Sequence, residues 1–216
     1  MFEGFDWQAI LVAAIALLSL INGLSVLQNT LSDRPKLHVE PVDDADWMWW
    51  SQIIDESGPE PVRRYVVIGN LTVMNIGRRP TSVAKTEMRI GLQNRETADS
   101  GLYTLPRPEV IYSSTETQRP TPVVETGIPE DTRLVLQSGE ASSGLHCFLF
   151  GMYGSEEWAP RIHDGLLWGA LTLTDVFGKT FDSKLGFRYV EFAALEGYFP
   201  TLRDFVIRHL DDGPDA

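Results

Sequence analysis

The stretch Arg64-Tyr-Val-Val-Ile-Gly-Asn-Leu-Thr-Val-Met-Asn75 decides the fold class. β-Branched and aromatic side chains dominate it, and such residues fit the pleated surface of a sheet, so it predicts a long central strand. The residues that follow, Asn75-Ile-Gly-Arg-Arg-Pro80, have the chemistry of a turn.

Further strands are predicted on both sides of this one. Leu37 and Val39 alternate with polar residues, and the apolar positions between Val83 and Leu92 lose their phase near residues 84–86, which indicates a bulge. The run Asp175-Val-Phe-Gly178 between two alternating stretches predicts a tight hairpin. The other expected strands cover residues 123–124, 134–136, 145–150, 166–174 and 180–184.

Seven to nine short strands without interleaved helices favour an antiparallel β-sandwich over residues 36–190, interrupted by an irregular insertion at 93–122. The expected core consists of Val66, Ile68, Leu71, Val73, Leu136, Phe148, Leu171 and Leu173. After the sandwich, residues 191–210 form a helical segment with Thr201 as its N-cap, and residues 211–216 form a frayed tail.

The N-terminal part differs in composition, because no charged residue occurs from Trp7 to Ser32. We expect a tail at 1–6, a transmembrane helix at 7–30 and a linker at 31–35, since about 20 apolar residues span a bilayer core. Arg34 and Lys36 flank only the C-terminal end of this helix, so the positive-inside rule predicts a single-pass membrane protein with a cytoplasmic C-terminal domain.

Composition excludes several classes of function. With 18 Lys+Arg against 30 Asp+Glu the net charge is −12, which disfavours nucleic acid as a partner. The single cysteine, Cys147, forms neither an intramolecular disulfide nor a Cys-rich zinc site. Nucleophile-elbow, phosphate-loop and metalloprotease motifs are missing from the sequence, so we expect no catalytic residue, no cofactor and no metal.

The sequence resembles uncharacterised single-pass membrane proteins of bacteria and phages. The similarity lies in three motifs of turn chemistry: Arg34-Pro-Lys-Leu-His-Val39, Asn75-Ile-Gly-Arg-Arg-Pro80 and Thr174-Asp-Val-Phe-Gly-Lys179. The resemblance implies that the sandwich is immunoglobulin-like, and it transfers no catalytic residue.

Two groups of residues are candidates for contacts. An extended strand here has two apolar faces, because of Trp47, Trp49 and Trp50. One face can join the core, and the other must be covered by the rest of the fold, by a partner or by the membrane interface. The N-terminal helix has a stripe of small residues. The stripe either mediates a contact with another helix or reflects only the ordinary frequency of alanine in such helices. The stripe contains Ala9, Ala13, Ala16, Ser19 and Gly23.

These features favour a membrane-anchored, non-catalytic scaffold that contacts the lipid bilayer and holds a protein partner of unknown identity. The sequence does not determine the oligomeric state. One alternative is a phage or prophage accessory protein that acts at the membrane in exclusion or defence. The other is a hydrolase, which would require His38, His146 and His163 to converge with acidic residues in one cleft.

Overall fold

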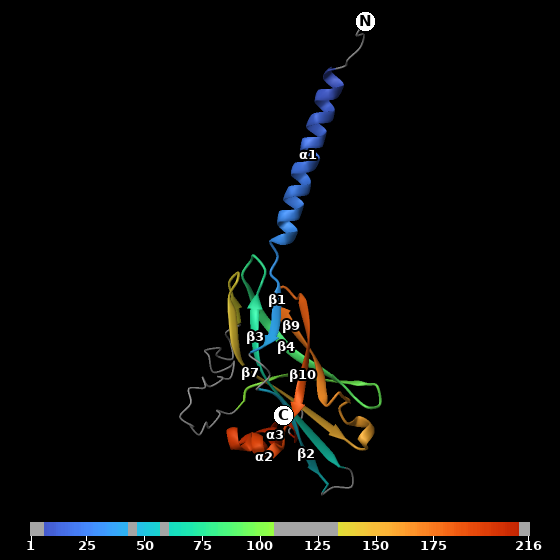
Figure 1. Cartoon of the computed structure of the whole chain (residues 1–216), viewed down its shortest axis with the longest axis vertical. Helices are drawn as coiled ribbons and strands as arrows, with labels where there is room; N and C mark the ends of the chain where they lie inside the picture. Colours follow the sequence, from blue (N-terminus) through green and yellow to red (C-terminus); the bar gives the residue numbers. More distant parts are fainter. Residues whose placement is uncertain (1–6, 43–46, 57–60, 106–133, 212–216) are drawn as a thin grey trace.

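A computed structural model describes residues 7–42, 47–56, 61–105 and 134–211. Among these residues, more lie in strands than in helices, and the three α-helices lie toward the two ends of the chain (Figure 1). The helices are α1 (Trp7–Ser32), α2 (Phe192–Tyr198) and α3 (Leu202–Asp211), with a 3-10 turn η1 (Glu156–Trp158). The strands are β1 (Leu37–Pro41), β2 (Met48–Asp55), β3 (Val62–Asn75), β4 (Thr81–Gly91), β5 (Thr97–Tyr103), β6 (Leu134–Leu136), β7 (Ala141–Tyr153), β8 (Ile162–His163), β9 (Leu166–Asp175) and β10 (Thr180–Tyr189).

The sheet closes on itself. Its strands follow the order β4-β5-β7-β3-β2-β10-β9, and β9 pairs with β4 to complete a barrel of seven strands. All neighbours within the ring are antiparallel except β2 and β10, which run parallel through Trp49 and Trp50. The remaining strands lie beside the ring: β1 on β3, β6 on β4, and β8 on β9.

The prediction of an immunoglobulin-like sandwich is therefore wrong, although the chain is mainly β. A sandwich needs two separate sheets, whereas the pairings β4–β9 and β2–β10 join all the strands of the ring into one sheet. The resemblance to single-pass sandwich proteins is therefore wrong as well. The motifs that carry it are turns, and turns do not determine which distant strands pair.

The transmembrane prediction is also wrong. Across the described residues, no helix combines the length and the apolar character that crossing a bilayer requires. The predicted single-pass anchor and the cytoplasmic placement inferred from it lose their basis. Contact with the lipid bilayer as a partner stays a prediction.

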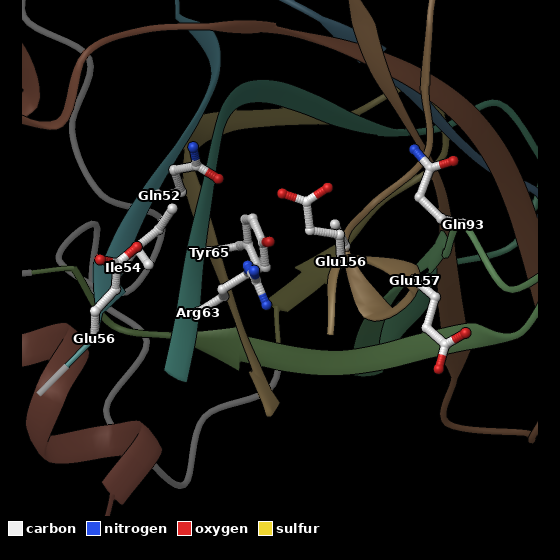
Figure 2. Close-up of a pocket in the computed structure, with 9 residues that line it drawn as sticks. Gln52, Ile54, Glu56, Arg63, Tyr65, Gln93, Glu156 and Glu157 are labelled. Atoms are coloured by element: carbon white, nitrogen blue, oxygen red, sulfur yellow. The ribbon is translucent and has the colours of Figure 1, made fainter. Parts of the chain in front are cut away.

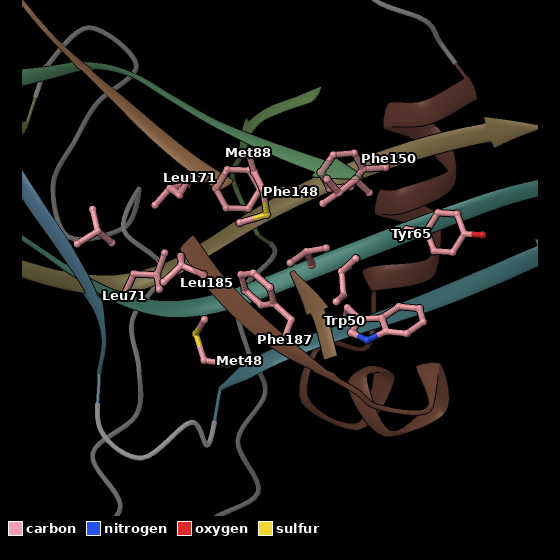
Figure 3. Close-up of a cluster of buried hydrophobic side chains, with 14 of the residues drawn as sticks. Met48, Trp50, Tyr65, Leu71, Met88, Phe148, Phe150, Leu171, Leu185 and Phe187 are labelled. Atoms are coloured by element: carbon pink, nitrogen blue, oxygen red, sulfur yellow. The ribbon is translucent and has the colours of Figure 1, made fainter. Parts of the chain in front are cut away.

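Two cores lie on the two sides of the barrel wall. Along β3, Tyr65 and Val67 point into the barrel, while Val66 and Ile68 point outward against the C-terminal helices. Figure 3 shows the inner core around Met88, Phe148 and Phe187. In the outer core, the helices contribute Phe192, Leu195, Phe199, Leu202 and Val206.

Local predictions agree better with the structure. The hairpin at Asp175–Gly178 forms, with Gly178 at φ 78°, and the bulge in β4 lies between Val83 and Lys85. All eight residues expected in the core are buried. Of the predicted insertion at 93–122, residues 97–103 form β5, whereas 106–122 lie outside the described residues. Of the predicted frayed tail at 211–216, Asp211 belongs to α3, and 212–216 lie outside the described residues, as does the predicted tail at 1–6.

Candidate functional site

A pocket opens at the end of the barrel where β2, β4 and β7 end and β3 begins. We call it the barrel mouth; its volume is about 550 Å³. Polar side chains dominate its lining, which consists of Gln52, Ile54, Glu56, Arg63, Tyr65, Gln93, Glu156, Glu157 and Ala159 (Figure 2).

The floor of the mouth is built by the alternation of β2 and β3. Gln52 and Ile54 continue the inward face of β2 beyond Met48 and Trp50, and Arg63 precedes Tyr65 on the inward face of β3. The barrel interior is therefore apolar in its middle and becomes polar at this end.

The opposite wall is the η1 segment, which hydrogen bonds fasten to the β4–β5 turn. The backbone N–H groups of Gln93 and Asn94 donate to the carbonyls of Ala159 and Glu157 at 3.0 and 2.8 Å. The Arg161 guanidinium donates to the carbonyl of Leu92 at 2.9 Å. These bonds fix Glu156 and Glu157 opposite the strand floor.

Tyr65 is the most unusual residue of the mouth. Its side chain is only 1% exposed, yet its hydroxyl has no hydrogen-bond partner. Burial raises the pKa of Tyr65, with a smaller lowering by Arg63 and a smaller raising by Glu156. The hydroxyl is thus a neutral, desolvated donor and acceptor at the floor of a pocket.

Arg63 lies beside it on the same face of β3 and is half-buried. Its guanidinium donates a hydrogen bond to the carbonyl of Gly154, which links β3 to the residues that precede η1. In Figure 2, the Glu156 carboxylate extends over Tyr65 toward the middle of the pocket, whereas Glu157 points away from it.

The three tryptophans predicted as contacts divide between the two cores. Trp50 is 8% exposed and lies inside the barrel, 6.4 Å from Tyr65 between ring centroids. Trp47 and Trp49 are half-buried outside it, 4.5 Å apart, and both contact Tyr198 of α2. We call Trp47, Trp49 and Tyr198 the aromatic seam. The fold itself covers part of it, and the partner contact stays a prediction.

The small-residue stripe lies on α1, which projects away from the barrel (Figure 1). Ala13, Ala16, Ser19 and Gly23 are exposed, and nothing outside the helix's own backbone would contact a side chain at Gly23. Ala9 belongs to the helix, but its side chain is outside the described residues. The helix–helix contact also stays a prediction.

The histidines do not converge. His146 is buried in β7 with its Nδ1 3.1 Å from the carbonyl of Gly144, and burial lowers its pKa to about 4. His38 and His163 are exposed and adjoin Glu40 and Asp164. Neither they nor His146 line the mouth. Over the described part of the chain, no group of three or more His, Cys, Asp or Glu side chains could hold a metal ion.

Cys147 offers no accessible nucleophile. It is fully buried in the outer core, and burial raises the pKa of its thiol.

Sequence reasoning missed the mouth. Arg63, Glu156 and Glu157 are not among the residues that the sequence analysis singles out as candidates. The available signal was the placement of Arg63 two residues before Tyr65, because a charged residue in phase with the inward face of a strand marks the point where that face meets water.

Comparisons with known proteins add little to this geometry. No protein-family model matches the chain, and no curated protein matches it either. Among solved structures, a crystal structure provisionally described as an ApaA protein from Bordetella pertussis is 11% identical and covers 73% of this chain and 96% of its own, with a TM-score of 0.30. An X-ray structure of a structural-genomics target is 10% identical and covers 73% and 89%, with a TM-score of 0.29. Similarities this low support no conclusion about function.

Proposed function

We propose that this protein is a non-catalytic binding module that holds a protein partner at the barrel mouth. The observation that carries the proposal is the hydroxyl of Tyr65, which is buried and unpartnered at the floor of a 550 Å³ pocket. A buried hydroxyl without a hydrogen bond costs about 1–3 kcal/mol, and a bound group can recover that energy by supplying the bond.

The size of the mouth suits a small molecule or one or two side chains of a partner. Binding pockets generally measure about 300–1,000 Å³ and present a few polar groups that fix the orientation of the ligand. The η1 segment is fastened by backbone hydrogen bonds, so the pocket exists before the partner arrives, which lowers the entropic cost of binding.

The dispersal of the histidines supports a binding role over a catalytic one. The hydrolase alternative required His38, His146 and His163 to share a cleft, and the mouth contains none of them. Its titratable side chains are three glutamates, one arginine and one tyrosine with a raised pKa, without an adjacent nucleophile and base.

The proposal is tested by site-specific photo-cross-linking in the cells that naturally produce the protein. A photoreactive amino acid replaces Gln93 at the rim of the mouth or, as a matched control, the exposed Gln137 near the opposite end. We expect one discrete protein adduct from position 93 and none of the same mass from position 137. Identical adducts from both positions, or none from position 93, would contradict the proposal.

The aromatic seam is a second candidate contact, because Tyr198 remains 38% exposed and both tryptophans are only half-buried. If the seam binds the partner, Trp49→Ser should abolish the adduct from position 93 while the melting temperature falls only slightly. An adduct that survives this substitution assigns the contact to the mouth alone.

A further inference from the structure

The barrel mouth has an excess of negative charge. Its lining contains three carboxylates, those of Glu56, Glu156 and Glu157, against the single guanidinium of Arg63. The whole chain has a net charge of −12, so the long-range field favours the approach of cations and opposes that of anions.

The carboxylate of Glu156 is available to a ligand. Considering only the described residues, it forms no ion pair and accepts no hydrogen bond, although it extends toward the middle of the pocket (Figure 2). Arg63, the one cation in the lining of the mouth, instead donates to the carbonyl of Gly154. An unpaired carboxylate beside a pocket binds a cation more strongly than one that an internal guanidinium already neutralises.

The buried hydroxyl of Tyr65 is an independent indication of a ligand. It lies below Glu156 and is close enough for the Glu156 charge to raise its pKa. A neutral phenol can accept a hydrogen bond from a cationic donor, and the side-chain carbonyl of Gln52 is a further acceptor in the same lining.

From this arrangement we infer that the barrel mouth binds the ammonium or guanidinium group of a lysine or arginine side chain that the partner inserts. Glu156 forms the ion pair, the Tyr65 hydroxyl accepts a hydrogen bond, and Ile54 and Ala159 contact the aliphatic stem. This inference rests on the proposed function and specifies the group that the mouth recognises.

The inference is tested by calorimetry on the full chain, in a non-ionic detergent that covers the exposed apolar side chains of α1. The probes are a capped pentapeptide with a central lysine, the same peptide with norleucine, and 1,5-diaminopentane as a free amine. We expect the lysine peptide to bind, with an affinity that falls as salt rises, and the norleucine peptide not to bind.

Three variants locate the binding. We expect Glu156→Gln to weaken binding of the lysine peptide by at least tenfold and Tyr65→Phe to weaken it severalfold. Glu40→Gln, which removes an equal charge from β1 beyond the mouth, should leave the affinity unchanged. Melting curves verify that all three variants fold.

Each outcome is decisive. Equal binding of the lysine and norleucine peptides, or equal weakening by Glu156→Gln and Glu40→Gln, would overturn the inference. Tighter binding of 1,5-diaminopentane than of the peptide would show that the source is a free amine. Because the cross-linking at position 93 does not depend on the charge of the ligand, an adduct there without lysine binding would overturn this inference and leave the proposed function in place.

Discussion

At the end of the barrel nearest α1, Asn75 is fully buried and every polar atom of its side chain is used. Its Oδ1 accepts from the N–H groups of Gly77 and Lys36 at 3.0 and 3.3 Å, and its Nδ2 donates to the carbonyls of Arg79 and Leu136 at 2.7 and 3.2 Å. At the barrel mouth, Tyr65 is equally buried on the same strand, but its hydroxyl has no partner.

The difference separates a polar group that stabilises the fold from one that we propose to bind a ligand. Asn75 ties together the exit of α1, the β3–β4 turn and β6, so its hydrogen bonds stabilise the fold. Tyr65 contributes an unsatisfied group that destabilises the free protein and is retained at a pocket, as expected for a group that binds a ligand.

The largest effect is expected from Trp50, which packs below the mouth. Trp50→Ser leaves a large cavity in the inner core and should lower the free energy of unfolding by about 4 kcal/mol. Trp49→Ser removes a half-buried ring and should lower it by about 1–2 kcal/mol. Urea denaturation measures both free energies of unfolding. Equal losses would show that Trp50 below the mouth contributes no more to stability than Trp49 of the aromatic seam.

Asn75→Ala should lower the free energy of unfolding by about 3 kcal/mol, because it leaves buried donors and acceptors unpaired around Gly77 and Leu136. Asn75→Asp serves as the matched variant, since it keeps the acceptor Oδ1 but places a buried carboxylate oxygen against the carbonyls of Arg79 and Leu136. Urea denaturation at pH 7 should therefore rank the free energy of unfolding in the order wild type, Ala, Asp. A loss below about 1 kcal/mol for Asn75→Ala would break the comparison between the two ends.

His146 predicts a pH dependence. Its pKa is about 4 in the folded protein and about 6.5 when unfolded, so the unfolded state binds the proton first as the pH falls. The stability that its neutral form maintains is complete above pH 6.5 and is lost progressively toward pH 4, about 2 kcal/mol of it by pH 5. Urea denaturation of wild type and His146→Gln at pH 7 and pH 5 measures this difference, and identical pH dependence of both would contradict it.

The smallest effect on stability is expected from Tyr65→Phe, which removes only an unpartnered hydroxyl. The free energy of unfolding should stay within about 0.5 kcal/mol of wild type or rise. A loss of more than about 1.5 kcal/mol in urea would mean that the hydroxyl is satisfied inside the protein, and the contrast with Asn75 would disappear.

Local features of the fold could be predicted from sequence because nearby residues encode them. The β-branched and aromatic residues of Tyr65 to Val73 identified β3 and its buried positions, and the spacing of Asp175 and Gly178 identified the hairpin. In that hairpin, Asp175 Oδ1 accepts from the N–H groups of Phe177 and Lys179, both at 2.9 Å, so the turn depends on its own residues.

Closure of the barrel could not be predicted in this way. It depends on Met88 of β4 pairing with Leu171 of β9 and on Trp50 of β2 pairing in parallel with Tyr189 of β10. These partners are far apart in the chain, and β-rich sequences of the same alternation also suit a sandwich. The mouth was missed for the same reason, since Glu156 reaches Tyr65 only through that tertiary arrangement.

Gly77 allows the residues that follow α1 to pack closely against the β3–β4 turn where the helix leaves the barrel. A Cβ at this position would lie 2.4 Å from the carbonyl oxygen of Arg34 and from the backbone nitrogen of Lys36, so the β3–β4 turn and the exit of α1 fit together only because glycine lacks a side chain. The ion pair of Arg79 with Asp33, at 2.8 Å, braces the same junction. The helix thus leaves one end of the barrel (Figure 1). The mouth opens at the other end, where β2 and β7 end and β3 begins. Whatever engages α1 and whatever enters the mouth are held apart by the length of the barrel, so both can be bound at once without competing for space.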